Sequence, residues 1–88
     1  MEPVSLAQIQ YFVAVAEEGN VGRAARRLRM SQPPLSRQIR GLEDEVGARL
    51  LSRTARGVTL LPAGEVFLGY ARRILAEVEE AVGAVRGR

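Results

Sequence analysis

One short stretch, residues 31–40, carries the side chains best suited to chemistry with another molecule. Its sequence is Ser-Gln-Pro-Pro-Leu-Ser-Arg-Gln-Ile-Arg. Ser31 is a favourable N-cap, because its hydroxyl can accept from the free amides of the first helical turn. Prolines are tolerated within that turn, where the missing N–H has no intrahelical partner. The stretch therefore predicts a helix that begins here and ends near Gly47.

The predicted helix has two faces of different character. One is an apolar stripe with steps of four, three and four residues: Leu35, Ile39, Leu42 and Val46. The other, at about 100° per residue, carries a hydroxyl and two guanidinium groups: Pro33, Ser36, Arg37 and Arg40. This arc suits a DNA groove, where arginine reads guanine and a hydroxyl contacts a base edge or phosphate. A solvated face that merely carries arginines would look the same from this helix alone.

Composition narrows the chemistry. The chain has 88 residues, enough for one small domain with an appended helix, and contains neither cysteine nor histidine. Disulfides and thiolate metal sites are thereby excluded, and the usual general base is missing. We expect no enzyme, no cofactor and no metal site. No apolar run approaches the ~20 residues that span a bilayer, and no secretory signal is visible, so we expect a cytoplasmic protein without a membrane partner.

Positive charge is concentrated around the predicted helix. The net charge is +3 overall, but −3 over residues 1–19, +6 over residues 20–60 and zero over residues 61–88. This distribution is the one that a polyanion-binding surface requires. Every basic residue is an arginine, which favours bidentate contacts to phosphate and guanine. An arginine-biased genome would give the same composition.

A first helix is predicted from Ser5 to about Glu18. Ser5 and Gln8 have the spacing of a capping box, and Gly19 stops the helix. Its expected inward face consists of apolar residues at helical spacing: Leu6, Ile9, Phe12, Val13 and Ala16. We interpret this helix as scaffold.

A short second helix, residues 21–28, follows with Asn20 as its N-cap. Residues 29–30 form a turn before the third helix. Helix, short turn and helix make a helix-turn-helix over about residues 21–40, in which the second helix enters the major groove. An ordinary helical hairpin is the alternative, and the surrounding arginines weigh against it.

An acidic cluster closes the third helix. Glu43, Asp44 and Glu45 lie in its last turn, an unfavourable place for negative charge beside the helix dipole. Our hypothesis is that these carboxylates pair with Arg40 or Arg49 and keep that end of the helix away from phosphates.

A small β-hairpin is predicted next. Two short apolar runs flank a polar tip, and Gly57 is expected at a left-handed turn position. Arg53 and Arg56 lie near that tip. A basic hairpin after a helix-turn-helix is a wing, which can place an arginine in the adjacent minor groove.

Pro62 marks the first turn of a final helix of about 24 residues, roughly 36 Å long. An apolar seam runs along it in steps of four and three: Phe67, Ala71, Ile74, Val78, Ala81 and Val85. Three further residues widen the seam: Val66, Tyr70 and Val82. A small domain cannot cover so long a helix, so the seam pairs with a second copy or packs on a domain missing from this chain. A helix folded entirely back on its own domain is the alternative.

Together these motifs resemble the N-terminal region of LysR-type transcriptional regulators. The resemblance is collinear from about residue 5 to residue 75, and it is most specific in residues 31–39, Ser-Gln-Pro-Pro-Leu-Ser-Arg-Gln-Ile. Further matching runs are residues 10–20, 24–28, 42–43, 46–47, 50–53, 56–58 and 63–64. One departure is Leu61 before Pro62, where the family usually has a capping threonine.

The resemblance implies a mainly α fold. Three helices and a short β-hairpin form a winged helix-turn-helix over residues 1–61, and residues 62–88 form a linker helix for dimerisation. The chain then looks like the DNA-binding region of a longer bacterial regulator, with the effector-binding domain absent. Such proteins bind interrupted palindromic operators in double-stranded DNA as dimers, usually within a tetramer, and RNA polymerase is a further expected partner.

The helix faces and the resemblance together identify the candidate residues. The expected DNA contacts are Asn20, Ser31, Gln32, Pro33, Ser36, Arg37, Arg40, Arg53 and Arg56. The expected dimerisation residues are Phe67, Tyr70, Ala71, Ile74, Val78 and Val82. A helical dimerisation module whose basic face is merely solvated remains a rival. RNA binding is disfavoured, because all four aromatic residues lie on predicted helices and offer no stacking platform.

Overall fold

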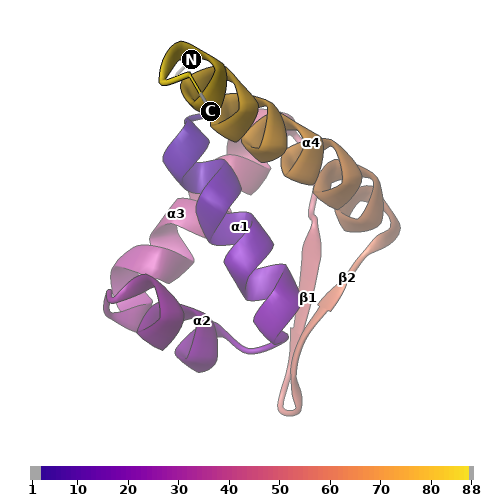
Figure 1. The fold of residues 1–88 in the computed structure, drawn as a ribbon. Coiled ribbons are helices and arrows are strands. Elements are labelled where there is room, and N and C mark those ends of the chain that lie inside the picture. The colour runs from indigo at the N-terminus through magenta and orange to yellow at the C-terminus, as the bar shows by residue number, and fades with distance from the viewer. Residues whose placement is uncertain (1–2, 88) are drawn as a thin grey trace.

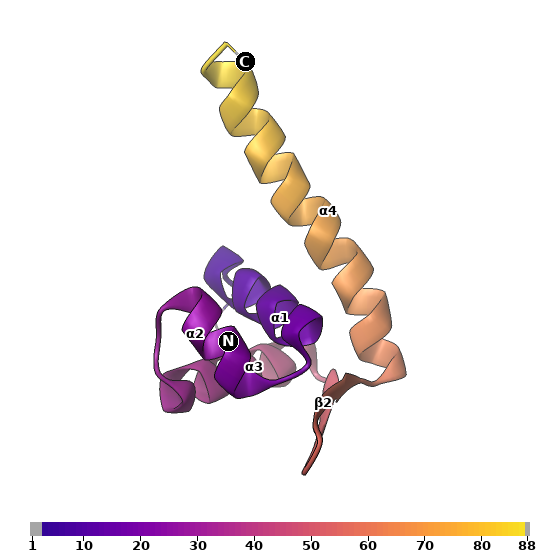
Figure 2. The ribbon, with the colours of Figure 1, turned by 60° about the horizontal axis from the view of Figure 1, so that its bottom comes forward.

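A computed structural model describes residues 3–87; residues 1, 2 and 88, at the ends of the two expected domains, lie outside the described part. Its elements, in order, are α1 (Leu6–Glu18), α2 (Val21–Leu28), α3 (Gln32–Val46), β1 (Leu51–Thr54), β2 (Gly57–Leu60) and α4 (Pro62–Val85). Helices α1, α2 and α3 form a bundle with the hairpin at its side (Figure 1). Helix α4 extends away as a rod (Figure 2). The predicted winged helix-turn-helix with a long appended helix is confirmed.

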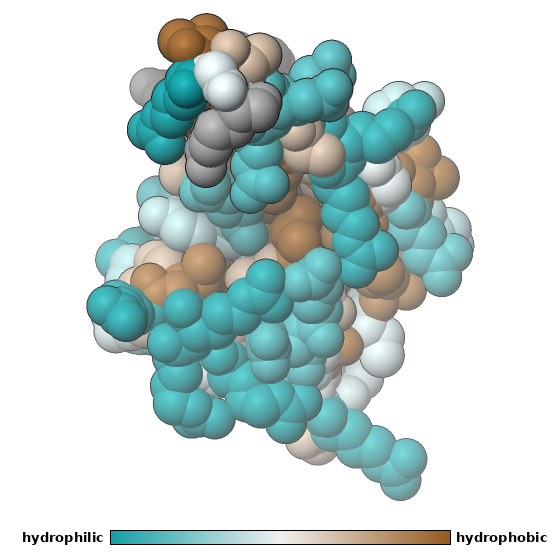
Figure 3. All heavy atoms as spheres, in the orientation of Figure 1, coloured by the Kyte–Doolittle hydropathy of each residue, from teal (hydrophilic) through white to brown (hydrophobic). Residues whose placement is uncertain are grey.

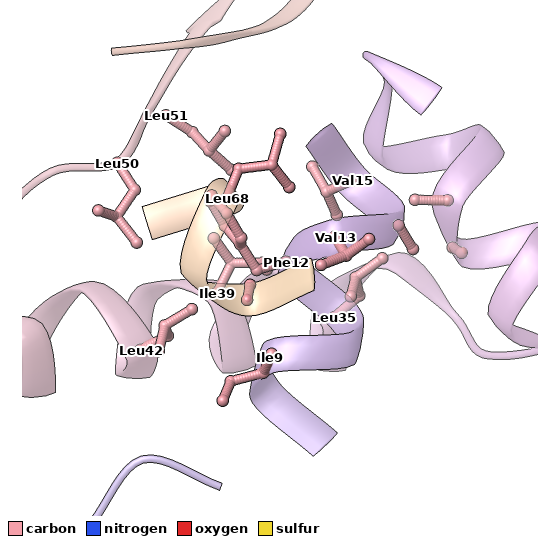
Figure 4. Packing of buried hydrophobic residues seen from close by; sticks show 14 residues of the cluster. Ile9, Phe12, Val13, Val15, Leu35, Ile39, Leu42, Leu50, Leu51 and Leu68 are labelled. Atoms are coloured by element: carbon pink, nitrogen blue, oxygen red, sulfur yellow. The ribbon is translucent and has the colours of Figure 1, made fainter. Parts of the chain in front are cut away.

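The core is built around α1. Phe12 is fully buried, and its ring meets Phe67 of α4 edge to face, with centroids 5.4 Å apart and planes at 80°. The apolar stripe of α3 closes the other side, where Leu35, Ile39 and Leu42 are almost completely buried (Figure 4). Burying one such large side chain contributes about 1.5–3 kcal/mol. Helix α1 therefore holds both α3, which carries the candidate DNA contacts, and α4.

The predicted capping of α1 and α2 is confirmed. The amide of Gln8 donates to Ser5 Oγ at 3.1 Å, and the amide of Ser5 donates to Gln8 Oε1 at 3.0 Å. Gly19 ends α1 in the left-handed conformation. Asn20 Oδ1 accepts from the amide of Arg23 at 2.8 Å and so caps α2.

The expectation that the Ser31 hydroxyl caps α3 is wrong. Within the described residues, Ser31 occupies the N-cap position but makes no side-chain capping bond. The amides that a cap engages belong to the second and third helical residues. Here these are Pro33 and Pro34, which have no N–H. Proline rigidity thus replaces the capping bond and leaves the hydroxyl exposed.

Two residues assigned to inward faces are exposed. Leu6 is 48% exposed at the start of α1, and Val46 is 38% exposed at the last turn of α3. Glu43 is buried near that end of α3 instead. The apolar stripe therefore gives way to a polar contact at the end of α3.

This polar contact joins α3 to the hairpin. Glu43 Oε2 accepts from the amides of Leu50 and Leu51 at 2.8 and 3.2 Å, and it lies 3.6 Å from Arg49 Nε. The hypothesised pairing of the acidic cluster with Arg49 is confirmed for Glu43, while Asp44 is exposed. A buried carboxylate is stable here because two amides and a guanidinium satisfy its oxygen.

The hairpin is antiparallel and pairs Leu51 with Leu60 and Thr54 with Gly57. Gly57 has a positive φ of 131°, but it is the first residue of β2 rather than a left-handed residue of the tip. A Cβ there would collide with the carbonyl oxygen of Gly19, and the amide of Val58 donates to that same oxygen at 2.9 Å. The hairpin is thus fixed to the end of α1 as well as to α3.

Helix α4 packs on the domain along a narrower line than the predicted seam. Gly64, Leu68 and Ala71 are buried, and a Cβ at Gly64 would collide with the Leu50 carbonyl oxygen. The assignment of Ala71 to the dimerisation seam is corrected, because Ala71 is fully buried within its own domain. Phe67 packs on Phe12 but is only half-buried. The large apolar residues left exposed along α4 are Val66, Tyr70, Ile74, Val78, Val82 and Val85. No helix of residues 3–87 combines the length and apolar character needed to cross a membrane.

Glu17 connects three helices. Arg27 of α2 lies 2.9 Å from its carboxylate, and Arg72 Nη2 of α4 donates to it at 3.1 Å. The hydrogen bond from Arg27 lowers the pKa of Glu17 most; burial opposes this, and the hydrogen bond from Arg72 lowers the pKa further. The ionised carboxylate therefore favours the observed placement of α2 and of α4 against α1.

We expect Glu43→Ala to lower the free energy of unfolding by about 1–3 kcal/mol, because two buried amides lose their acceptor. Urea unfolding of the 88-residue chain measures the change. Asp44→Ala, one residue along α3 but exposed, is the control and should shift the value by less than about 0.5 kcal/mol. Equal effects of the two variants would show that the hydrogen bonds from the Leu50 and Leu51 amides to Glu43 do not add to the free energy of unfolding.

We expect Glu17→Gln to destabilise the chain slightly at pH 7, by about 0.2–1 kcal/mol, since the partners are substantially exposed. A carboxylate whose pKa is lowered by folding stabilises the native state above its ordinary pKa of 4.5. This stabilisation is lost as pH falls through the lower, folded value. Unfolding at pH 7 and pH 3 should therefore give a difference from the wild type only at pH 7. Glu79→Gln on α4 is the control, and a difference that persists at pH 3 would contradict the assignment.

Candidate nucleic-acid interface

A tight turn fixes α3 against α2. Arg29 ends α2 in the left-handed conformation with φ 57°, and the amide of Met30 donates to the Ala25 carbonyl at 3.0 Å. Ala24 and Ala25 are buried, which lets α1 and α3 approach α2 closely. The expected helix-turn-helix therefore presents the N-terminal half of α3 outward.

The polar arc of α3 is accessible, as its spacing predicts. The exposed residues of this arc are Gln32, Pro33, Arg37 and Arg40. Ser36 is half-buried, and its hydroxyl accepts from Arg53 Nη1 of the hairpin at 3.3 Å. This hydrogen bond brings together two candidate residues that lie 17 positions apart in the sequence.

An open hollow of about 340 Å³ separates the start of α2 from the hairpin. Asn20, Gln32, Ser36 and Arg53 line it, so four of the nine expected DNA contacts meet there. The N-terminus of α2 also borders the hollow, and its amides and dipole favour an anion. Sequence reasoning missed Gly22, which lines the same hollow; nothing in the local sequence distinguished this glycine from other helical residues.

The hairpin tip carries Arg56. The amide of Arg56 donates to Thr54 Oγ1 at 3.2 Å, and that hydroxyl donates to the Gly57 carbonyl at 3.4 Å. These bonds order the tip while the Arg56 side chain stays exposed. Hydrophilic residues cover α2 and the hairpin tip at the lower edge of Figure 3. Arg56 can thus reach a surface beside α3, although it does not line the hollow.

Ion pairs divide the arginines into two groups. Arg23 and Arg27 of α2 pair with Glu17 and Glu18 of α1, so their charges are largely compensated. By contrast, in the part of the chain that the structure describes, the arginines of the polar arc and of the hairpin have no carboxylate oxygen within 4.0 Å: Arg37, Arg40, Arg53 and Arg56. The same holds for Arg26 and Arg29 at the end of α2 and for Arg73 and Arg86 of the C-terminal segment. Uncompensated positive charge therefore lies on α3 and the hairpin, and also at the end of α2, whereas Arg23 and Arg27 add less than their formal charge.

Among residues 3–87, no group of three or more side chains of the metal-binding types could hold an ion. The hollow is open and polar, and the charged side chain in its lining is that of Arg53. Such a surface suits a polyanion rather than a small substrate.

Comparison with known proteins gives a consistent result. Residues 6–65 match the family described as bacterial regulatory helix-turn-helix protein, lysR family. The HTH-type transcriptional regulator TfdT of Cupriavidus pinatubonensis is 55% identical over 78 residues, which cover 89% of this chain and 34% of TfdT. ClcR of Pseudomonas putida is 56% identical over 81 residues, 92% of this chain and 27% of ClcR. The chain thus spans about a quarter to a third of these curated relatives.

Two solved structures with DNA are also similar. The CbnR DNA-binding domain in its DNA complex has a TM-score of 0.90 and 46% identity, covering 94% of this chain and 95% of that one. The BenM DNA-binding domain with catB site 1 DNA has a TM-score of 0.90 and 44% identity, covering 93% and 92%.

Proposed function

Because the chain belongs to the LysR family of bacterial helix-turn-helix regulators, we propose that it reads an interrupted palindromic operator as one half of a dimer. It is a DNA-binding domain of a transcriptional regulator, and its relatives are regulators rather than enzymes. The observation that carries the proposal is the cluster of uncompensated arginines on α3 and the hairpin, around the Ser36–Arg53 hydrogen bond.

The proposed readout separates base contacts from phosphate contacts. Gln32, Ser36 and Arg37 lie on the outward arc of α3, and we assign them to base edges in the major groove, with Pro33 packed beside them. Arg56 at the hairpin tip is assigned to the minor groove, where width and potential attract a guanidinium. The remaining expected contacts are assigned to phosphates: Asn20, Ser31, Arg40 and Arg53.

The proposed dimer uses the free side of α4. Tyr70, Ile74, Val78 and Val82 are 38–57% exposed and follow one another at steps of four residues. Pairing two such helices would remove this apolar line from water. For a longer regulator that contains this domain, we propose a tetramer that lies in the cytoplasm and contacts RNA polymerase.

The experiment is a titration of labelled duplexes across a salt series. One duplex is an interrupted palindrome recovered by in vitro selection with this chain, and the other is its scrambled sequence. The proposal predicts strong preference for the palindrome and steep salt dependence. Equal binding to both would leave only a basic surface. Self-association without DNA binding would favour the rival dimerisation module.

We expect Arg37→Ala to cost about 1–3 kcal/mol on the selected palindrome and to relax the base preference at one position, because a bidentate contact to guanine is lost. Arg53→Ala should weaken both duplexes alike. The control is Arg86→Ala, which removes the same charge at the far end of α4. An equal loss on both duplexes for Arg37→Ala would make Arg37 a phosphate contact only.

We expect Val78→Glu to weaken self-association at least tenfold, because it places a charge on the exposed apolar line of α4. Sedimentation equilibrium measures the dissociation constant. Ala76→Glu is the matched control, since Ala76 is exposed on the same helix and off that line. Unchanged association of Val78→Glu would contradict pairing through this face.

A further inference from the structure

A second hollow lies on the other side of the Ser36–Arg53 hydrogen bond. Its volume is about 270 Å³, and it is lined by Arg40, Glu43, Asp44, Arg49 and Arg53. Arg53 therefore borders both hollows, one toward the start of α2 and one toward the end of α3. Arg49 is not among the nine expected DNA contacts.

Arg49 is held in place at this hollow. Its side chain is 72% exposed, yet its Nε lies 3.6 Å from the buried carboxylate of Glu43. The same carboxylate oxygen accepts from the amides of Leu50 and Leu51, so Glu43 cannot move away without losing these bonds. The ion pair with Glu43 thus positions the Arg49 guanidinium, and most of its surface remains free to donate to another acceptor.

The charges around the hollow select the ligand. Three guanidiniums face two carboxylates, and one of these, Glu43, is already occupied by backbone amides and Arg49. The net charge of the side chains that line this hollow is therefore positive. A phosphate offers several acceptor oxygens to a planar guanidinium, whereas the exposed Asp44 limits how much negative charge can enter.

We propose that Arg49, with Arg40 and Arg53, holds one phosphate of the DNA backbone beside the end of α3. The inference rests on the proposed DNA-reading function and deepens it. The two hollows follow each other along α3, one beside its start and one beside its end, and Arg53 of the hairpin borders both. Arg49 fixes how α3 sits in the groove and carries no base preference of its own.

The test compares the salt dependence of Arg49→Ala with that of the wild-type chain on the selected palindrome and its scramble. Loss of one phosphate contact should reduce the slope of log K against log salt by about 0.9 for each bound copy. Affinity should fall about tenfold on both duplexes alike. Arg49→Lys keeps the charge and should keep the slope. Arg86→Ala, remote on α4, should change neither quantity.

A second measurement locates the phosphate contact on the DNA. Duplexes that each carry one neutral methylphosphonate are titrated with the wild-type chain to find the backbone positions that it contacts. One of these positions should no longer matter in Arg49→Ala, because the contact is already lost. If a methylphosphonate and Arg49→Ala weaken binding additively at every backbone position, the inference is overturned. An unchanged salt slope in Arg49→Ala would also overturn it. A loss confined to the palindrome would instead identify a base contact and also overturn it. If the wild type itself shows no preference, the proposed function fails first.

Discussion

The buried carboxylate of Glu43 is the constraint on which the DNA-facing surface depends. It belongs to α3 and binds the two amides that begin the hairpin, so one side chain fixes the reading helix and the wing to each other. Burying an ionised group without partners costs free energy. Glu43 must therefore keep these hydrogen bonds, and they fix its position relative to the hairpin. The distance between Ser36 on α3 and Arg53 on the hairpin follows from this bridge. The negative charge of Glu43, at the acidic end of α3, thereby stabilises the fold.

Two close backbone approaches complete the frame. Gly57 lets the hairpin reach the carbonyl of Gly19, and Gly64 lets α4 reach the carbonyl of Leu50. Both approaches need a residue without a Cβ, so the hairpin is held at the end of α1 and α4 starts beside the hairpin. The reading helix, the wing and the long helix consequently behave as one unit, and the placement of α4 in a dimer would set the separation of two reading surfaces.

The sequence predicts the local elements well, because caps, prolines and apolar steps are short-range signals. Long-range contacts are harder. Nothing local shows that Glu43 binds amides of the next segment or that Arg27 is compensated by α1. The heptad seam of α4 mixes two faces, since Phe67 and Ala71 satisfy the spacing but pack on their own domain. Ser31 fails as a cap for a reason visible in the sequence, namely the two prolines at the amide positions.

The most direct test of the account maps the DNA on the chain itself. Backbone amide shifts of the 88-residue chain are recorded by NMR while the selected palindrome is added. The account predicts the largest changes at the start of α2, in the N-terminal half of α3 and at the hairpin tip, with small changes along α4 beyond the domain. Changes concentrated on α4, with α3 and the hairpin unaffected, would contradict it.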